Sequence, residues 1–132
     1  MINEENFIEK YVPFDREIVV EIIDIFIEEY DERIEKIYHH IKTKNLSELQ
    51  KSTHAFKGVI ANFETNCKAY DEISKMESEA QVMLDYEQNA EKTNPAENES
   101  FYENIEKVFF SFRKNSRRML NQLKELRKNY TD

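Results

Sequence analysis

The sequence predicts an all-α protein, and both its composition and its periodicity favour that fold class. Charged residues make up 35% of the 132 residues and hydrophobic residues 39%, with one glycine, two prolines and no tryptophan. This composition is typical of long helices with one solvated face, whereas a sheet needs turn residues at short intervals. Apolar residues also recur at steps of three and four, the spacing that buries one stripe of a helix. A chain of this length and apolar content is expected to form one domain over residues 1–132.

A short first helix is predicted over residues 3–11, because Pro13 restricts the backbone of the residue before it and so ends the helical pattern. Its apolar residues Phe7, Ile8 and Tyr11 lie on one side. We expect this helix to lie across the other helices as a lid.

A long second helix is predicted from the N-cap candidate Asp15 to about residue 41. Its apolar stripe consists of Val19, Ile22, Ile23, Phe26, Tyr30, Ile34, Ile37 and Ile41. Its acidic face holds Glu21, Glu28, Glu29, Asp31, Glu32 and Glu35. We interpret that face as a solvated surface and not as a metal site, because the polar side of an amphipathic helix normally carries charges.

Asn45, followed three residues later by Glu48, resembles a capping box and predicts a helix that runs to about Phe63. The connection before it is short, so this helix and the preceding one are expected to be antiparallel neighbours. A further helix is predicted over residues 66–88, with apolar positions Tyr70, Ile73, Met76, Ala80, Met83 and Leu84.

The polar stretch 89–98 contains Pro95 and predicts a loop. Ser100 with Glu103 then predicts the start of the last helix. Its expected core positions are Phe101, Ile105, Val108, Phe109, Phe112, Leu120, Leu123 and Leu126.

The charge balance argues against nucleic acid as a partner, because the formal net charge is -8 and phosphate backbones attract clustered Lys and Arg. The one basic cluster, interpreted as a solvated helix face, comprises Arg113, Lys114, Arg117 and Arg118. No apolar run approaches the ~20 residues of a membrane span, and the N-terminus lacks the basic start of a signal peptide. The lone Cys67, interpreted as a small residue on a helix face, suits a reducing compartment. We therefore expect a cytoplasmic protein that contacts no membrane.

The stretch from Thr53 to Phe63 holds the only glycine of the chain, Gly58. Inside a helix a glycine costs about 1 kcal/mol relative to alanine, so something other than helix stability must favour it. The buried stripe of this helix is expected to be Leu49, Thr53, Phe56, Ile60 and Phe63. His54 lies roughly 140° from the centre of that stripe and is expected to face solvent, with Lys57 and Gly58 one turn along the same surface.

The motif His54-x-x-Lys57-Gly58, followed by a small and apolar run that ends in Ala61-Asn62-Phe63, resembles the signature of histidine phosphotransfer (HPt) domains. As a pattern of helices, the resemblance extends from about Asp15 to the C-terminus. It implies that the chain is a single HPt-like domain, an antiparallel four-helix bundle with a short N-terminal helix. It also implies a phosphocarrier in a two-component phosphorelay, which holds a phosphoryl group on His54 between receiver-domain aspartates.

The resemblance further implies that the partners are response-regulator receiver domains, including the receiver of a hybrid histidine kinase. The protein is expected to act as a monomer and to be a phosphotransfer substrate more than an enzyme. It needs no cofactor or metal of its own, since receiver domains supply an acidic metal site and the aspartate. The binding surface is expected to centre on the face that holds Gln50, Lys51, His54, Lys57, Gly58 and Ala61, with an apolar rim from neighbouring helices.

The residue types suit that chemistry. Imidazole is largely neutral near pH 7 and can attack phosphorus without a separate base, which makes His54 the expected phosphoacceptor. The Lys57 ammonium can offset charge on the phosphoryl oxygens. Gly58 removes a side chain where a partner must come close.

Other functions find less support in the sequence. His39 and His40 are adjacent in a helix, so their side chains diverge by about 100° and do not easily share a metal. The sequence has no glycine-rich loop to cradle nucleotide phosphates and no Cys/His cluster with zinc spacing. Two alternatives stay open: a helical adaptor or inhibitor that binds a receiver domain without phosphotransfer, and a structural bundle with no signalling role.

Overall fold

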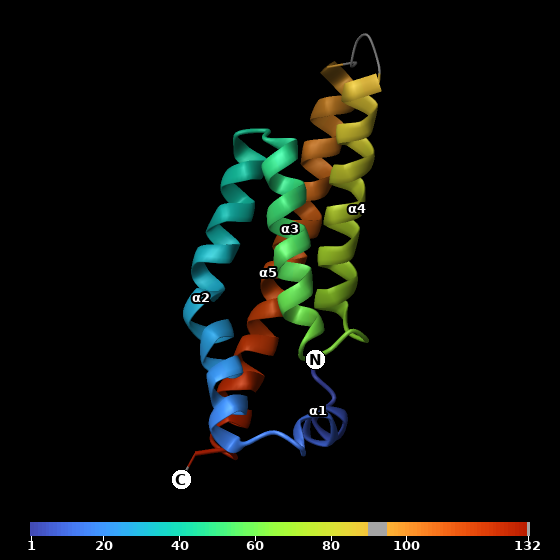
Figure 1. Cartoon of the computed structure of the whole chain (residues 1–132). Coiled ribbons are helices and arrows are strands. Elements are labelled where there is room, and N and C mark those ends of the chain that lie inside the picture. Colours follow the sequence, from blue (N-terminus) through green and yellow to red (C-terminus); the bar gives the residue numbers. More distant parts are fainter. Residues whose placement is uncertain (90–94, 132) are drawn as a thin grey trace.

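All regular secondary structure in the described part of the chain is helical (Figure 1). The computed structural model describes residues 1–89 and 95–131. The helices are α1 (Glu4–Tyr11), α2 (Arg16–Lys42), α3 (Leu46–Ala61), α4 (Lys68–Asn89) and α5 (Pro95–Arg127). The all-α prediction is thus confirmed.

The four long helices lie side by side, and α1 lies across their lower end (Figure 1). Each long helix packs mainly against two of the others: α3 lies between α2 and α4, and α5 also packs against both α2 and α4. The core between them is apolar and rich in aromatic side chains. Phe56 of α3, which is fully buried, contacts the rings of Phe26, Tyr30 and Phe112.

The lid expected of α1 is present. Its Phe7 is buried, with ring centroids 6.0 Å from Phe63 and 6.4 Å from Tyr130, while the Tyr11 hydroxyl donates to the Asn62 carbonyl at 3.0 Å. These contacts join α1 to the C-terminal ends of α3 and α5. The expectation that Ile8 shares the packed side is wrong, because Ile8 is exposed. It follows Phe7 directly, and adjacent residues of a helix point about 100° apart.

Of the two predicted N-cap residues described here, Asn45 and Asp15, only Asn45 caps its helix through its side chain. The Asn45 side chain accepts a hydrogen bond from the Glu48 backbone N–H at 3.2 Å and so caps α3. Asp15 occupies the N-cap position of α2, but its side chain makes no capping hydrogen bond. Here the backbone carbonyl of Asp15 begins the helix, accepting from the N–H groups of Ile18 and Val19.

Three helix ends differ from the sequence prediction by two residues or more. α4 begins at Lys68 and not at residue 66. α3 ends at Ala61 and not near Phe63, although Phe63 is still buried in the turn that follows. α5 begins at Pro95, five residues before the predicted start at Ser100. Proline fits the first turn of a helix, where its missing N–H is not needed, so Pro95 starts a helix where we expected a loop. Residues 90–94 of that predicted loop lie outside the described residues.

Apart from Ile8, the apolar positions expected to pack are at least partly buried, and most of them are buried. Those that are only half-buried are Ile22, Tyr70, Met83, Leu84, Phe101 and Val108. The prediction missed three buried residues of α5, namely Tyr102, Ser116 and Met119. Ser116 was missed because its hydroxyl is satisfied inside the core, 2.7 Å from the hydroxyl of Tyr30.

The outer faces carry charge as expected. All four residues of the basic cluster on α5 are exposed: Arg113, Lys114, Arg117 and Arg118. None of the helices within residues 1–89 and 95–131 is both long and apolar enough to cross a membrane.

Candidate functional site

Buried residues of α3 fix the direction in which His54 points. Thr53, Phe56 and Ile60 are completely buried, and the Thr53 hydroxyl donates to the Leu49 carbonyl at 2.8 Å inside the helix. Because the helix turns by about 100° per residue, the His54 side chain is rotated by about 100° or more from each of these three buried residues and faces away from the core. Its side chain is 72% exposed, which confirms the predicted exposure.

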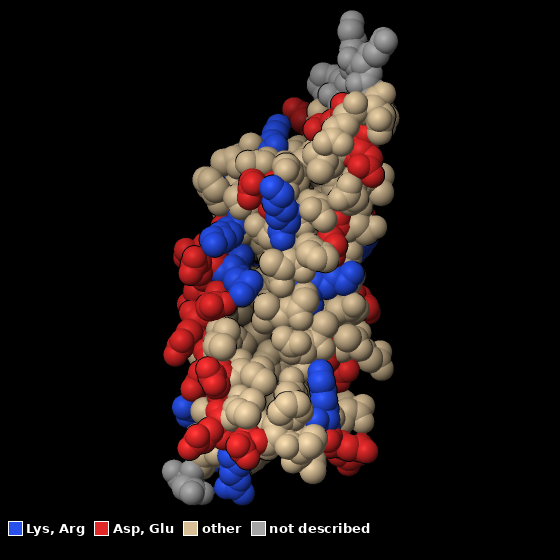
Figure 2. All heavy atoms as spheres, in the orientation of Figure 1, with Lys and Arg blue, Asp and Glu red and all other residues tan. Residues whose placement is uncertain are grey.

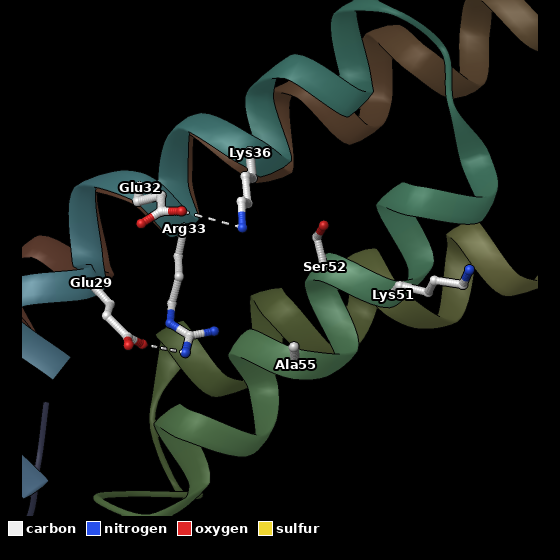
Figure 3. A pocket seen from close by; sticks show the side chains of 7 residues that line it. All are labelled: Glu29, Glu32, Arg33, Lys36, Lys51, Ser52 and Ala55. Atoms are coloured by element: carbon white, nitrogen blue, oxygen red, sulfur yellow. Dashed lines mark hydrogen bonds and ion pairs between the residues drawn. The ribbon is translucent and has the colours of Figure 1, made fainter. Parts of the chain in front are cut away.

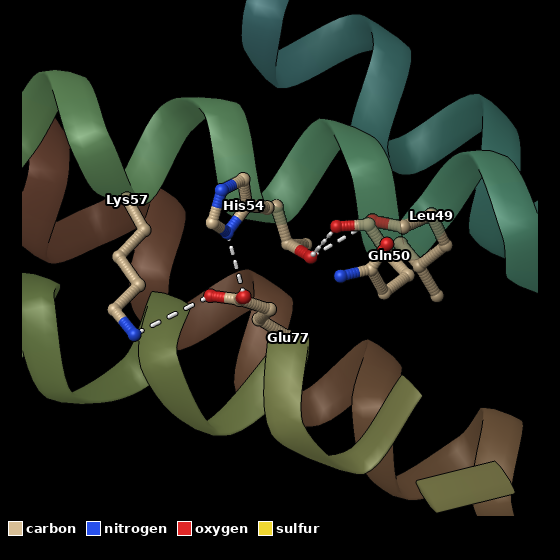
Figure 4. A network of polar contacts seen from close by, with 6 residues as sticks. Leu49, Gln50, His54, Lys57 and Glu77 are labelled. Carbon is tan, nitrogen blue, oxygen red and sulfur yellow. Dashed lines mark hydrogen bonds and ion pairs between the residues drawn. The ribbon is translucent and has the colours of Figure 1, made fainter. Parts of the chain in front are cut away.

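The imidazole does not stand alone, because a carboxylate on the neighbouring helix holds one of its nitrogens. His54 Nδ1 lies 2.8 Å from Oε1 of Glu77 on α4 (Figure 4). The same carboxylate extends its other oxygen toward Lys57, whose Nζ lies 3.4 Å from Glu77 Oε2. His54, Glu77 and Lys57 thus form one cluster, which we call the His54 triad.

The carboxylate lies deeper than its two partners. The Glu77 side chain is 15% exposed, compared with 33% for Lys57. Its Oε2 atom is buried without an aligned hydrogen bond among the described residues, so the Lys57 ammonium is the charge that compensates it. Lys57 also lies over the ring of Tyr70, 5.8 Å from the ring centroid. An ion pair this sheltered is screened less than one on an open surface.

The Glu77 contact decides which nitrogen of His54 is free. A carboxylate can only accept, so Nδ1 must donate its proton to Glu77. In the neutral ring the lone pair then lies on Nε2, the outer nitrogen. The arrangement therefore presents a nucleophilic nitrogen to solvent, with a cation close by.

The structure gives no internal reason for the glycine at position 58. A Cβ built on Gly58 meets no atom within 4 Å among the described residues, and its φ is not positive. Neither packing inside the protein nor backbone conformation requires a glycine there. The space left open over Gly58 is on the exterior, one turn beyond His54.

The other residues of the predicted binding face divide between the two edges of α3. On a helix of 3.6 residues per turn, Gln50 and Ala61 lie on the same edge as Lys57, toward α4, while Lys51 and Gly58 lie on the edge toward α2. Gln50 and Ala61 are half-buried, and Lys51 is exposed with its ammonium 3.6 Å from Glu48. His54 is at the middle of the face.

A polar groove follows the α2 edge of this face. It encloses about 340 Å³ and is lined by Glu29, Glu32, Arg33, Lys36, Lys51, Ser52 and Ala55 (Figure 3). Within α2, Arg33 pairs with Glu29 and Lys36 with Glu32, so the α2 cations of the groove already have partners. The small side chains of Ser52 and Ala55 leave the groove open.

Below the groove the α2 surface becomes apolar. Ile18, Ile22 and Ile25 repeat at helical spacing and continue the line of Glu29, so they lie on the side of α2 that adjoins α3. Ile18 is 41% exposed and Ile25 is 45% exposed. On the same face of the molecule, mostly uncharged residues gather over the lower part of α2 and α3, bordered by acidic side chains along α2 (Figure 2).

Sequence reasoning missed Glu77. Glu77 lies four residues after Ile73 and three before Ala80, so it adjoins the buried stripe of α4. From this spacing one could have predicted a carboxylate at the edge of a contact between helices. Only the register of α4 against α3 brings it to His54, however, and a sequence pattern does not contain that register. Glu77 is the one member of the His54 triad that comes from another helix.

The remaining candidates differ from one another. His39 is exposed, whereas His40 is half-buried, and burial lowers the pKa of His40 from the usual 6.5. Cys67 lies in the connection before α4 and not on a helix face as we expected. In the parts of the chain that the structure describes, no group of His, Cys, Asp and Glu residues is arranged to hold a metal ion.

Comparisons with family models, with curated proteins and with solved structures gave no match for this chain.

Proposed function

We propose that this chain is a cytoplasmic phosphorelay intermediate of the HPt type, which carries a phosphoryl group on His54 between the aspartates of receiver domains. In this proposal α2, α3, α4 and α5 form the antiparallel four-helix bundle of such a domain, and α1 closes one end. The observation that carries the proposal is the exposed ring of His54 whose Nδ1 is held by Glu77. That contact leaves Nε2 as the nucleophile.

The residues around His54 suit a carrier better than an enzyme. In-line phosphoryl transfer depends mainly on positioning and on charges that neutralise the transferring group. The chain offers an accessible nucleophile, His54, with the ammonium of Lys57 one turn away. The acidic metal site and the aspartate that the reaction also needs would come from the receiver domain.

Lys57 has a natural role in this scheme. It is held beside His54 by Glu77, and its long side chain can turn outward when a phosphoryl group arrives at Nε2. The group brings two negative charges, and an ammonium close to it lowers the energy of the transferring state.

The exposed surface around His54 supports docking of a folded partner. Gly58 leaves the backbone of α3 accessible one turn from the nucleophile, and Ile18, Ile22 and Ile25 provide an apolar rim on α2. The binding face of Gln50, Lys51, His54, Lys57, Gly58 and Ala61 would contact the rim of the receiver active site. Apolar contacts around a polar centre are the usual anatomy of such an interface.

The experiment that tests this function is incubation of the protein with a panel of phosphorylated receiver domains. The proposal predicts that at least one receiver transfers its label, and that the label on this protein is stable in alkali and lost in acid, as a phosphohistidine is. Stable complexes without any transferred label would instead favour the adaptor.

A further inference from the structure

Glu77 contacts both groups that the proposed reaction uses. One oxygen lies 2.8 Å from His54 Nδ1 and the other 3.4 Å from Lys57 Nζ. It is also the least exposed member of the His54 triad, so its charge acts at short range and with little screening. A purely structural contact between α3 and α4 would not require the carboxylate to hydrogen-bond to His54, the proposed nucleophile.

The first leg of transfer creates a positive charge on the ring. Nε2 uses its lone pair to bond phosphorus, while the bond from phosphorus to the donor aspartate oxygen breaks and its electron pair leaves with the carboxylate. No proton moves in this step. The phosphorylated ring keeps the Nδ1 proton and is cationic, next to the Glu77 carboxylate that accepts that proton in a hydrogen bond.

The second leg needs the same proton. When an acceptor aspartate takes the phosphoryl group, the electron pair of the N–P bond returns to Nε2. If Nδ1 still carries its proton, the departing ring is a neutral imidazole. If that proton has been lost to solvent, the departing ring would be an imidazolide anion, which leaves far less readily.

We propose, resting on the function given above, that Glu77 is a positioning residue for both legs: it retains the proton on Nδ1 and thereby sets the upper pH limit of onward transfer. The charged groups that face the ring are Glu77 from α4 and, from α3 itself, Lys57 and Lys51 one turn to either side. The two lysines disfavour a cationic ring, so Glu77 is the group that opposes them.

The test compares Glu77→Gln with the wild-type protein after both have been phosphorylated by potassium phosphoramidate. Glutamine keeps the size of the side chain and an oxygen that can accept from Nδ1, but it removes the charge. Removing the opposite charge of Glu77 at this distance should lower the pH at which phosphorylated His54 loses its Nδ1 proton by about one unit. At pH values where most of the phosphorylated ring has lost this proton, the rate of onward transfer to a receiver should then be roughly tenfold lower in Glu77→Gln than in the wild type.

Two readouts measure this effect. The pH midpoint of the ³¹P signal of phosphorylated His54 reports the ring proton, and single-turnover transfer between pH 6 and 9 reports its consequence. Glu79→Gln is the matched control, because it makes the same charge change on α4 at a residue that pairs only with Lys75 among the described residues. That control should leave both readouts unchanged.

The wild-type protein supplies a further readout that needs no variant. In the unphosphorylated protein, ring ¹⁵N signals of His54 should show a protonated Nδ1 and an unprotonated Nε2. A dominant Nε2–H tautomer, or an unshifted midpoint in Glu77→Gln, would overturn the role of Glu77. Phosphoramidate needs no receiver, so absence of labelling by every receiver would instead remove the proposed function.

Discussion

The ammonium of Lys57 lies 3.4 Å from Oε2 of Glu77, one helical turn beyond His54. The contact joins α3 to α4 and holds the ammonium close to His54 without placing it on the ring. Lys57 is one-third exposed, so in the proposed function its ammonium can leave the carboxylate and pair with a phosphoryl group. Replacing Lys57 therefore tests whether the protein is the proposed phosphate carrier or an adaptor.

Lys57→Ala should slow transfer more than it weakens binding. A cation that acts mainly when charge lies on the phosphoryl group changes the rate, whereas one that acts equally in all states changes only affinity. We expect the single-turnover rate at saturating receiver to fall about tenfold, or about 1.4 kcal/mol. A pure adaptor would show a modest loss of affinity from an exposed contact. Weakened binding with an unchanged rate would contradict the role of Lys57.

Gly58→Leu should obstruct docking without harming the fold. Since a Cβ at this position meets no described atom within 4 Å, the side chain can extend into solvent, and leucine favours helix by up to about 1 kcal/mol over glycine. Urea denaturation should show equal or greater stability, while transfer from a receiver slows strongly. Asn121→Leu, on an exposed position of α5, is the control. Transfer at the wild-type rate in Gly58→Leu would place the docking surface elsewhere.

Local signals in the sequence were sufficient for most of the fold. Apolar spacing predicted α2, α3 and α4 to within about two residues, and the distance of His54 from the stripe of Leu49, Phe56 and Ile60 predicted its exposure. The predicted start of α5 was wrong because proline is compatible with both a loop and the first turn of a helix, and Pro95 is in such a first turn. Local pattern does not distinguish these two uses of proline.

The site was predictable only in the part that a single helix carries. His54, Lys57 and Gly58 share α3, so their juxtaposition follows from helical geometry. Glu77 is 23 residues from His54 in the chain and meets it through packing of α4 against α3. The polar groove of α2 and α3 was missed for the same reason, because Arg33 and Ser52 come together only in the folded protein.

Phe56→Ala should destabilise the protein severely and so tests the anchoring of α3. Phe56 is fully buried, and its ring lies 5.3 Å from Phe112 and 6.2 Å from Phe26, measured between centroids. A cavity of that size typically costs about 3–5 kcal/mol of unfolding free energy. Phe110→Ala, which removes an exposed ring from α5, should cost far less. Similar losses from both substitutions in urea titrations would show that the core is not centred on Phe56.

His40 should make the protein less stable in mild acid. Burial is the main cause that lowers its pKa from 6.5; His39 and Lys36 add to the lowering, and Glu48 opposes it. The unfolded chain therefore binds the proton more readily than the folded one, so stability is complete above pH 6.5 and falls as the pH drops below it.

The measurement is the free energy of unfolding at pH 7.5 and pH 5.5. His40→Gln should lose less stability over this interval than the wild-type protein, whereas His39→Gln, at the exposed neighbour, should keep the wild-type difference. An identical pH difference in His40→Gln and wild type would show that protonation of His40 is not coupled to unfolding.

The most direct test of the account is phosphoryl transfer to His54→Gln. A receiver domain that labels the wild-type protein should leave no acid-labile label on this variant, while circular dichroism shows the same helix content. His39→Gln is the control and should be labelled as the wild type is. Loss of label only in His54→Gln is the result that the account predicts. Label that survives in His54→Gln, or that moves to His39 or His40, would contradict it.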